Sequence, residues 1–168
     1  MDHTKRRFLQ LLGAGAMLAM TGVGYAISGM GHAAAATITK LKLSNAEWRK
    51  RLTPARYNIL REEGTERPYS SALNNEKRAG KFHCAGCELA LFDSETKYDS
   101  RTGWPSFYQP IAGHVETKTD FKLIFPRTEY HCIRCGGHQG HIFKDGPRPT
   151  GLRYCNNGLA LNFKPKAA

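Results

Sequence analysis

Apolar residues alternate with other residues in two short stretches of the second half of the chain. In residues 121–125 the apolar series is Phe121, Leu123 and Phe125, and residues 159–163 repeat the same spacing. Glycine and proline are frequent throughout this part of the chain. A period of two between turn-forming residues is typical of strands in an antiparallel sheet. The pattern therefore predicts strands at both places and a mainly β domain.

Two helix-start signals precede this region. Ser44-Asn45-Ala46-Glu47 has the form of a capping box, in which the serine and glutamate side chains satisfy free amide groups of the first turn. Thr53-Pro54 has the form of an N-cap followed by the first helical residue, and Gly64 ends that segment about three turns later. These signals predict an N-terminal helical hairpin, which makes the whole an α+β arrangement.

The first 36 residues have the composition of an export signal. Lys5, Arg6 and Arg7 precede a long uncharged run, and alanines at 33–36 offer a cleavage site after Ala35 or Ala36. The segment resembles a twin-arginine signal with Lys5 in the place of the first arginine. The run is also long enough to be an uncleaved membrane anchor. We expect residues 1–36 to direct export to the periplasm, with membrane contact only through this leader if it is retained.

Residues 37–168 suit one domain with one core. Apart from the leader, 22 lysine and arginine residues stand against 13 acidic residues, a net charge of +9. Such a charge could attract nucleic acid or an anionic membrane. Acidic residues are interleaved with the basic ones, as at Glu62-Glu63 and at 93–95. A solvated surface explains this mixture, so we expect no nucleic-acid partner.

Five cysteines form two tight pairs and one singleton. The pairs are Cys84-Ala85-Gly86-Cys87 and Cys132-Ile133-Arg134-Cys135, and the singleton is Cys155. Four thiolates complete a tetrahedral shell for a structural zinc ion and leave no position for water. The spacing therefore predicts one structural Zn²⁺ held by Cys84, Cys87, Cys132 and Cys135. Any chemistry is then left to the fifth sulfur.

Two other states of the paired cysteines stay open. Export to an oxidising compartment favours two disulfides, which would make the chain a disulfide-stabilised structural domain. A redox-active C-x-x-C of the thioredoxin type is the second alternative. We favour zinc because a repeated C-x-x-C has the spacing of zinc sites. The twin-arginine route also carries folded proteins, which could take up metal before export.

The unpaired Cys155 lies in a polar stretch near the C-terminus. A free thiol is about 3% thiolate at pH 7, and a nearby positive charge raises that fraction. On an extended chain Arg153, Cys155 and Asn157 project to the same side. Asn157-Gly158 is also a strong hairpin signal, which would put Cys155 at the end of a strand. A buried structural thiol is the alternative to a reactive one.

Further candidates for chemistry lie between the second cysteine pair and Cys155. His138 and His141 are three residues apart, so on a flat strand they would face opposite ways unless the chain turns at Gly140. Histidine is the usual proton donor near neutral pH, although a structural role for one of the two is an equal alternative. Trp104, between Gly103 and Pro105, would by itself be interpreted as a core residue.

Taken together, these segments resemble the MsrB family, the peptide-methionine (R)-S-oxide reductases. The resemblance runs from about Ser44 to Pro165 and includes both cysteine pairs. Its other segments are Leu52-Thr53-Pro54, Gly64-Thr65-Glu66-Arg67-Pro68, Gly103-Trp104-Pro105-Ser106-Phe107, His138-Gln139-Gly140-His141-Ile142-Phe143 and Arg153-Tyr154-Cys155-Asn156-Asn157. The resemblance implies that residues 37–168 are a methionine sulfoxide reductase B domain. It also implies a fold of two twisted antiparallel sheets, with the zinc ion on the side away from the active cysteine.

The resemblance assigns catalytic roles to four residues. Cys155 would attack the sulfoxide sulfur and become a sulfenic acid as methionine leaves. His138, His141 and Asn157 would orient and protonate the substrate oxygen, directly or through water. Selectivity for the R epimer is implied by the resemblance alone.

The resemblance also implies which residues bind the substrate. Trp104 and Phe143 would form the apolar wall that holds the methyl group. Arg153 and Asp145 would tune the network around the thiolate. The substrate partner would be an oxidised protein that carries methionine sulfoxide.

The chain departs from many members of the family in the loop before Gly103. Ser100-Arg101-Thr102 lacks the recycling cysteine that often stands there, and no second free thiol remains once the pairs bind zinc. We therefore expect the sulfenic acid to be reduced by an outside donor, a thioredoxin-like protein or a small thiol. A zinc-ribbon interaction module without catalysis is the rival function, and it predicts no need for Cys155.

Overall fold

The computed structural model describes residues 37–123 and 125–167 of the chain. The predicted export signal at 1–36 lies outside the described residues. Within the described part, no helix has the length and the apolar character that are needed to cross a bilayer.

Two short helices begin where the capping signals predict them. Helix α1 (Asn45–Arg51) has Ser44 as its N-cap, and both bonds of the capping box with Glu47 are present. Helix α2 (Pro54–Glu62) has Thr53 as its N-cap, whose hydroxyl accepts a hydrogen bond from the Arg56 amide. The prediction of a helical hairpin is confirmed.

Helix α2 ends at a left-handed residue, but that residue is not the glycine. Glu63 has a φ of 55°, and Gly64 follows it. A Cβ atom on Gly64 would lie 2.5 Å from the Asn58 side chain. A larger residue at position 64 would therefore displace the Asn58 side chain.

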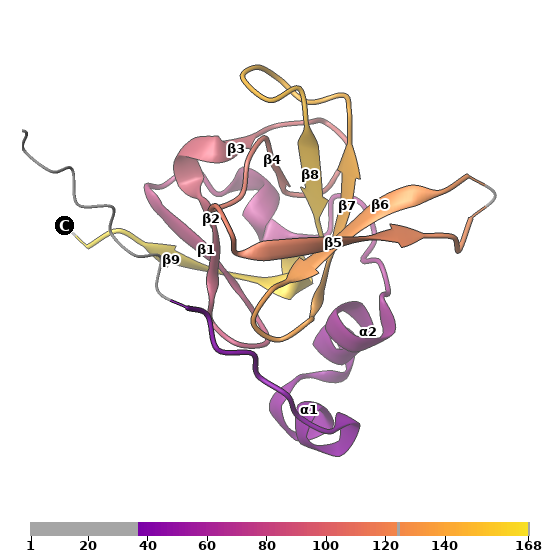
Figure 1. The fold of residues 1–168 in the computed structure, drawn as a ribbon. Helices are drawn as coiled ribbons and strands as arrows, with labels where there is room; N and C mark the ends of the chain where they lie inside the picture. The colour runs from indigo at the N-terminus through magenta and orange to yellow at the C-terminus, as the bar shows by residue number, and fades with distance from the viewer. Residues whose placement is uncertain (1–36, 124, 168) are drawn as a thin grey trace, which may run out of the picture. The chain divides into compact units, whose positions relative to one another are not determined.

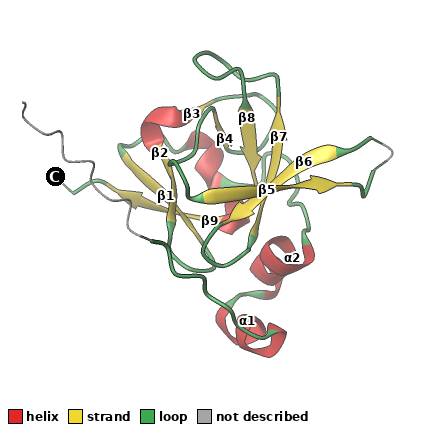
Figure 2. Cartoon of the chain, viewed as in Figure 1, coloured by secondary structure: helices red, strands yellow, loops and turns green. Residues whose placement is uncertain are grey.

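The remainder of the domain consists of two antiparallel sheets. A three-stranded sheet has the order β2 (Ala90–Asp93), β1 (Gly80–Cys84) and β9 (Leu161–Pro165). A six-stranded sheet has the order β3 (Lys97–Tyr98), β4 (Ser106–Phe107), β8 (Arg153–Asn156), β7 (His138–Phe143), β6 (Arg127–Cys132) and β5 (Val115–Asp120). Three 3₁₀ turns complete it: η1 (Ala72–Asn75), η2 (Ser94–Thr96) and η3 (Gly158–Ala160). The prediction of a mainly β fold with two antiparallel sheets is confirmed (Figures 1 and 2).

Aromatic rings fill the core. Phe92 stacks on Phe107 with ring centroids 4.1 Å apart, and Phe82 meets Phe107 edge to face at 4.9 Å. Tyr130 packs against Phe92 on the other side. These buried rings come from β1, β2, β4 and β6, so the core joins the two sheets.

Two strand predictions need correction. Residues 121–123 and 125 are not strand but belong to the tip between β5 and β6, because Asp120 ends β5 and its carboxylate accepts the Lys122 amide at 2.8 Å. Residues 158–160 form η3, so only the part from Leu161 is strand. Asn157-Gly158 therefore begins a 3₁₀ turn between the two sheets and does not form a hairpin.

Candidate active site

Cys155 lies on a central strand of the six-stranded sheet. Strand β8 runs between β4 and β7, where Cys155 is paired with Ser106 on one side and with His141 on the other. Directly opposite residues in a ladder point to the same face, with Cβ atoms about 5 Å apart. The thiol and the His141 imidazole are therefore neighbours across the sheet.

A β-bulge in strand β7 places His138 and His141 on the same face of the sheet. The register with β6 shifts between Tyr130 and His131, so that β7 gains one residue at Gln139. As a result the rings of His138 and His141 contact each other, with centroids 5.5 Å apart. Gly140 is needed in the same strand because a Cβ atom there would collide with the Cys155 carbonyl oxygen.

A pocket of about 130 Å³ opens beside the Cys155 thiol. Most of its lining comes from the segments that the sequence singled out, and it also includes Arg127. The lining residues are Thr65, Trp104, Arg127, Gly140, His141, Phe143, Cys155, Asn156 and Asn157. The structure therefore brings an indole, a phenyl ring, an imidazole and a thiol to one cavity.

The Cys155 thiol is half-buried, and its burial controls its acidity. Burial raises the pKa of the thiol, while Arg153 and the Thr102 side chain lower it. The balance is a raised pKa. Arg153 thus acts in the direction expected of a nearby positive charge, and burial is the larger effect.

His141 is held by a carboxylate that the sequence analysis did not single out. Its Nε2 lies 2.7 Å from Asp120 Oδ2, and the same oxygen accepts Arg127 at 2.6 Å. The Lys122 amide, His141 and Arg127 hold the pKa of Asp120 well below its usual range. Burial lowers the pKa of His141 in spite of Asp120. The imidazole is therefore neutral at pH 7, with its proton on Nε2 facing the carboxylate and a free lone pair on Nδ1.

His138 lies outside the lining of the pocket and is buried. Its Nδ1 lies 2.7 Å from Glu129, and the other oxygen of Glu129 lies 3.0 Å from His131. Burial opposes the charge of Glu129, but the two histidines overcome it and lower the pKa of the carboxyl to about 2. The Nε2 atom of His138 has no protein partner. His138 thus contacts the site through the ring of His141.

Asn157 joins three segments at the floor of the pocket. Its amide nitrogen donates to the Gln139 carbonyl at 3.1 Å, and its oxygen accepts the Glu66 amide at 3.1 Å. The Glu66 carboxylate in turn accepts the amides of Gly158 and Leu159. Asn157 is buried, and one of its two amide hydrogens remains for the pocket.

The predicted binding residues are found in two places. Trp104 and Phe143 line the pocket, and the indole nitrogen of Trp104 donates to the Glu66 carbonyl at 3.1 Å. Arg153 forms a two-bond pair with Asp145, at 2.9 and 2.8 Å, and its guanidinium lies 4.3 Å from the centroid of the Phe143 ring. Neither Arg153 nor Asp145 lines the pocket itself, and the pair is linked to it by the contact of Arg153 with Phe143.

The four paired cysteines converge on one point. The Cys84 and Cys135 sulfurs are 3.6 Å apart, those of Cys87 and Cys132 are 3.5 Å apart, and all four lie within 4.8 Å of one another. Thiolates around a tetrahedral zinc ion lie about 3.8 Å apart, because each Zn–S bond is about 2.3 Å long. A disulfide would need about 2.05 Å. The cluster could hold zinc, and none of its cysteines lines the Cys155 pocket.

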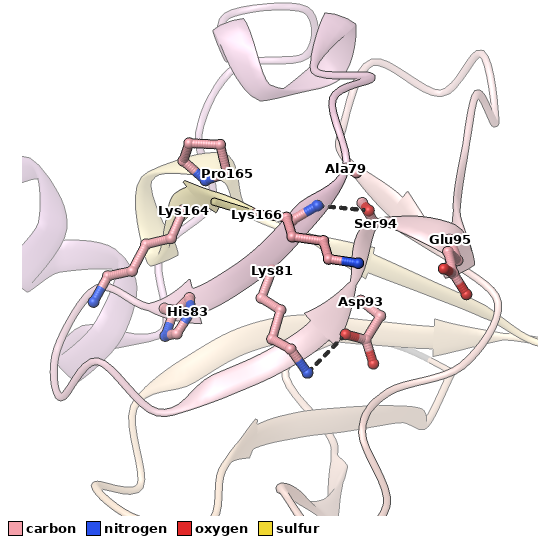
Figure 3. Close-up of a pocket in the computed structure, with 10 residues that line it drawn as sticks. Ala79, Lys81, His83, Asp93, Ser94, Glu95, Lys164, Pro165 and Lys166 are labelled. Carbon is pink, nitrogen blue, oxygen red and sulfur yellow. Dashed lines mark hydrogen bonds and ion pairs between the residues drawn. The ribbon is translucent and has the colours of Figure 1, made fainter. Parts of the chain in front are cut away.

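A larger hollow of about 560 Å³ lies elsewhere, beside β1 and β9. Figure 3 shows lysine side chains around it, with Lys81 paired to Asp93 at 2.9 Å. Its lining includes Lys164, Lys166 and Glu95 but no cysteine. Thiol chemistry therefore belongs to the smaller pocket at Cys155.

Comparison with known proteins identifies the family. A family model described as the SelR domain matches residues 52–165. The peptide methionine sulfoxide reductase MsrB of Pseudomonas putida is 52% identical over 130 residues, which are 76% of this chain and 96% of that protein. The MsrB of Leptospira interrogans is 51% identical over 122 residues, with 72% and 93% covered. The chain belongs to the MsrB family.

A plant relative of the MsrB family is longer than the region it shares with this chain. The chloroplastic peptide methionine sulfoxide reductase B1 of Arabidopsis thaliana is 55% identical over 122 residues, which are 72% of this chain. The match spans about 60% of the length of that protein.

Sequence reasoning missed several residues of this MsrB site. Asp120 and Glu129 hold the two histidines, Arg127 lines the pocket, and Glu66 fixes the turn after Cys155. The acidic residues are 21 and 9 positions away from their histidine partners. Only an antiparallel register between β5, β6 and β7 could have predicted these pairs. Glu66 lies within a segment of the family resemblance, but nothing in the neighbouring sequence predicts that its carboxylate accepts the amides of Gly158 and Leu159.

Proposed function

We propose that this protein reduces methionine (R)-S-oxide in proteins to methionine, with Cys155 as the nucleophile. The observation that supports this most directly is the ladder pairing of Cys155 with His141 at a pocket lined by Trp104 and Phe143. A methyl sulfoxide has one small apolar group and one strongly accepting oxygen. The two rings suit the methyl group, and the polar groups suit the oxygen. The choice of the R epimer rests on the family resemblance.

The first step uses the neutral pair of Cys155 and His141. The thiol is protonated at neutral pH because its pKa is raised, and the free Nδ1 atom of His141 can accept that proton. The sulfur then attacks the sulfoxide sulfur, and His141 returns the proton to the substrate oxygen. The protonated oxygen then passes from the substrate sulfur to the Cys155 sulfur, so that the substrate S–O bond and the newly formed S–S bond both break. The sulfoxide gains two electrons and leaves as methionine, while Cys155 loses two electrons and keeps that oxygen as a sulfenic acid.

The other polar residues support this step. The second amide hydrogen of Asn157 can be donated to the substrate oxygen, and the edge-to-face contact of His138 with His141 supports a role for His138 as a second donor through water. Arg153, oriented by Asp145 and Phe143, stabilises the thiolate as it forms.

The second step needs a donor from outside the domain. The loop 100–102 contacts Cys155 through Thr102 and carries no cysteine. Two thiol groups would reduce the sulfenic acid, either both from one thioredoxin-like protein or one from each of two small-thiol molecules. One disulfide and one water are released, and Cys155 returns to the thiol state.

We propose that the Cys84, Cys87, Cys132 and Cys135 cluster holds one structural zinc ion. Zinc bound there supplies folding energy and no chemistry, because four thiolates leave no coordination position open. We also propose that residues 1–36 export the protein to the periplasm, where it would be anchored only if the leader is retained. This part rests on the sequence of the leader alone.

The test is Cys155→Ser, assayed separately on peptides that carry the R and the S epimer. We expect wild-type turnover on the R epimer only, and a loss of at least about a thousandfold in the variant. The metal content and the melting temperature should stay unchanged, which shows that the domain is intact. Full turnover in the variant would contradict the enzymatic function and favour a non-catalytic interaction module.

A further inference from the structure

The exposed large hydrophobic residues of the described chain are close to the active-site pocket. Phe121, Leu123 and Phe125 are 76%, 58% and 78% exposed, and all three lie in the tip between β5 and β6. The fourth is Tyr69, whose amide donates to the carbonyl of Gly103, the residue before Trp104. Exposed apolar groups gathered in this way mark interaction surfaces.

The described residues of the tip, 121–123, 125 and 126, are continuous with the pocket at both ends. Asp120 before it holds His141, and Arg127 after it lines the pocket. Each exposed side chain of the tip is within three residues of one of these two. Three residues of extended chain span at most about 10 Å. The apolar side chains are therefore within the reach of a polypeptide that has one side chain in the pocket.

The base of the tip is fixed. Asp120 accepts the Lys122 amide at 2.8 Å and Arg127 at 2.6 Å, and the Lys122 amine reaches Glu63 at 2.7 Å. Figure 1 shows the β5–β6 hairpin projecting beyond the rest of the domain. The tip therefore presents its apolar side chains on a braced support.

We propose that Phe121, Leu123 and Phe125 of the tip form a docking surface for apolar residues that flank methionine sulfoxide in client polypeptides. This proposal rests on the proposed function and adds the surface that recognises the substrate. A methionine that is oxidised in a protein core has apolar sequence neighbours. With the oxidised side chain in the pocket, neighbours up to about three positions away reach the tip, given about 3.3 Å per residue.

The test compares two peptides and one small compound as substrates of the full-length protein, with dithiothreitol as the reductant. One peptide has leucine and phenylalanine within three positions of the (R)-sulfoxide, and the other has glycine and serine there. The small compound is N-acetyl-methionine (R)-S-oxide amide. The variant is Phe121→Ser with Phe125→Ser, and the matched control is Phe121→Leu with Phe125→Leu, which keeps the apolar character.

We expect the serine variant to raise KM for the apolar peptide about tenfold, on the scale of an apolar anchor lost from an interface. The polar peptide and the small compound should react as in the wild type, and the leucine control should stay close to wild type on all three. Equal changes on all three substrates, or none on the apolar peptide, would overturn the proposal. If the wild type did not reduce the small compound at all, that result would instead contradict the proposed function.

Two further measurements identify other occupants of the tip. If the serine variant is impaired only when thioredoxin replaces dithiothreitol, the surface serves the reductant and the proposal is wrong. If the variant loses binding to phosphatidylglycerol vesicles while KM for the apolar peptide stays unchanged, the occupant is a membrane, and the proposal is equally wrong.

Discussion

The cysteine cluster and the Cys155 pocket place the same side chain in two opposite settings. In the cluster each sulfur has other sulfurs as its neighbours, at 3.5 to 3.6 Å across the two pairs. In the pocket a single sulfur has an imidazole across the ladder and a guanidinium two residues away. Thiolates that saturate a metal ion are unavailable for chemistry, and a lone thiol beside a base can react. The role of a cysteine is therefore set by the groups that surround it.

The two regions are also joined by one side chain. The Gln139 amide donates to the Cys84 sulfur at 3.5 Å, and its oxygen accepts the Asn156 amide, next to Cys155, at 3.3 Å. Gln139 is fully buried and is the residue at the bulge of β7. The cluster thus braces the strand that carries the histidines of the pocket, although its cysteines touch no substrate.

The largest effect that we predict is the loss of folding when metal is removed from the cysteine cluster. Chelation by a strong zinc ligand should unfold the domain, because structural zinc contributes on the order of 10 kcal/mol to folding. Cys132→Ser should do the same. Far-ultraviolet circular dichroism and thermal melts would measure the loss, with Cys155→Ser as the control that stays folded. A metal-free domain that keeps its melting temperature would contradict the structural role of the cluster.

Asp120→Asn tests the Cys155 pocket, where we expect a loss of catalysis and not a loss of folding. An asparagine amide can donate to Nε2 of His141, so it favours the tautomer that has no lone pair on Nδ1. We expect kcat to fall about a hundredfold, the typical contribution of a positioned proton-transfer group, with KM changed little. The pH profile of kcat should lose the limb that His141 provides, which a purely structural defect would not cause.

Two variants control the Asp120 experiment. Asp120→Glu keeps a carboxylate and should recover part of kcat. Glu116→Gln changes an exposed acidic residue of the same strand, which pairs with Lys40, lies 3.5 Å from His131 and makes no contact with His141, and should change kcat little. A similar loss in Glu116→Gln would mean that the effect comes from strand β5 as a whole.

The parts of the fold that depend on local signals could be predicted from the sequence. The capping box at Ser44 and the N-cap signal at Thr53-Pro54 locate the two helices, and the cysteine spacing identifies the cluster, because each signal lies within a few residues. The tip at 121–125 shows the limit of this reasoning, since alternation with a period of two is the same in a half-buried strand and in an exposed turn. Only the Asp120 contact with the Lys122 amide ends the strand there.

The candidate site shows the same limit in its electrostatics. The residue types at Cys155, His141 and Trp104 are evident from the chain, and the structure brings these residues to one pocket. Their partners Asp120 and Glu129 depend on the register of three strands. The net shift of the Cys155 pKa depends on burial, which a sequence gives only indirectly.

The acidity of Cys155 gives the smallest predicted effect and tests the balance between burial and charge. Arg153 lowers the pKa of the thiol, and Asp145 raises it slightly. Because the thiol supplies the proton that His141 passes to the substrate oxygen, the rate should fall as pH rises through the raised pKa of the thiol. Arg153→Ala should raise that pKa and move this falling limb to higher pH. Asp145→Asn should move it to lower pH, with a rate change at pH 7 below about tenfold, less than one pKa unit would give.

Single-turnover rates from pH 6 to 10, together with thiolate absorbance near 240 nm, would measure both shifts. Opposite displacements in the two variants would mean that the charge pair tunes the thiol directly. Displacement of both variants toward higher pH would mean that Asp145 acts only by holding Arg153 in place. In that case the guanidinium is the one charge to which the thiol responds, and burial sets the remainder of its acidity. The cluster sulfurs, held by the proposed zinc ion, should give no absorbance change over this range in either variant.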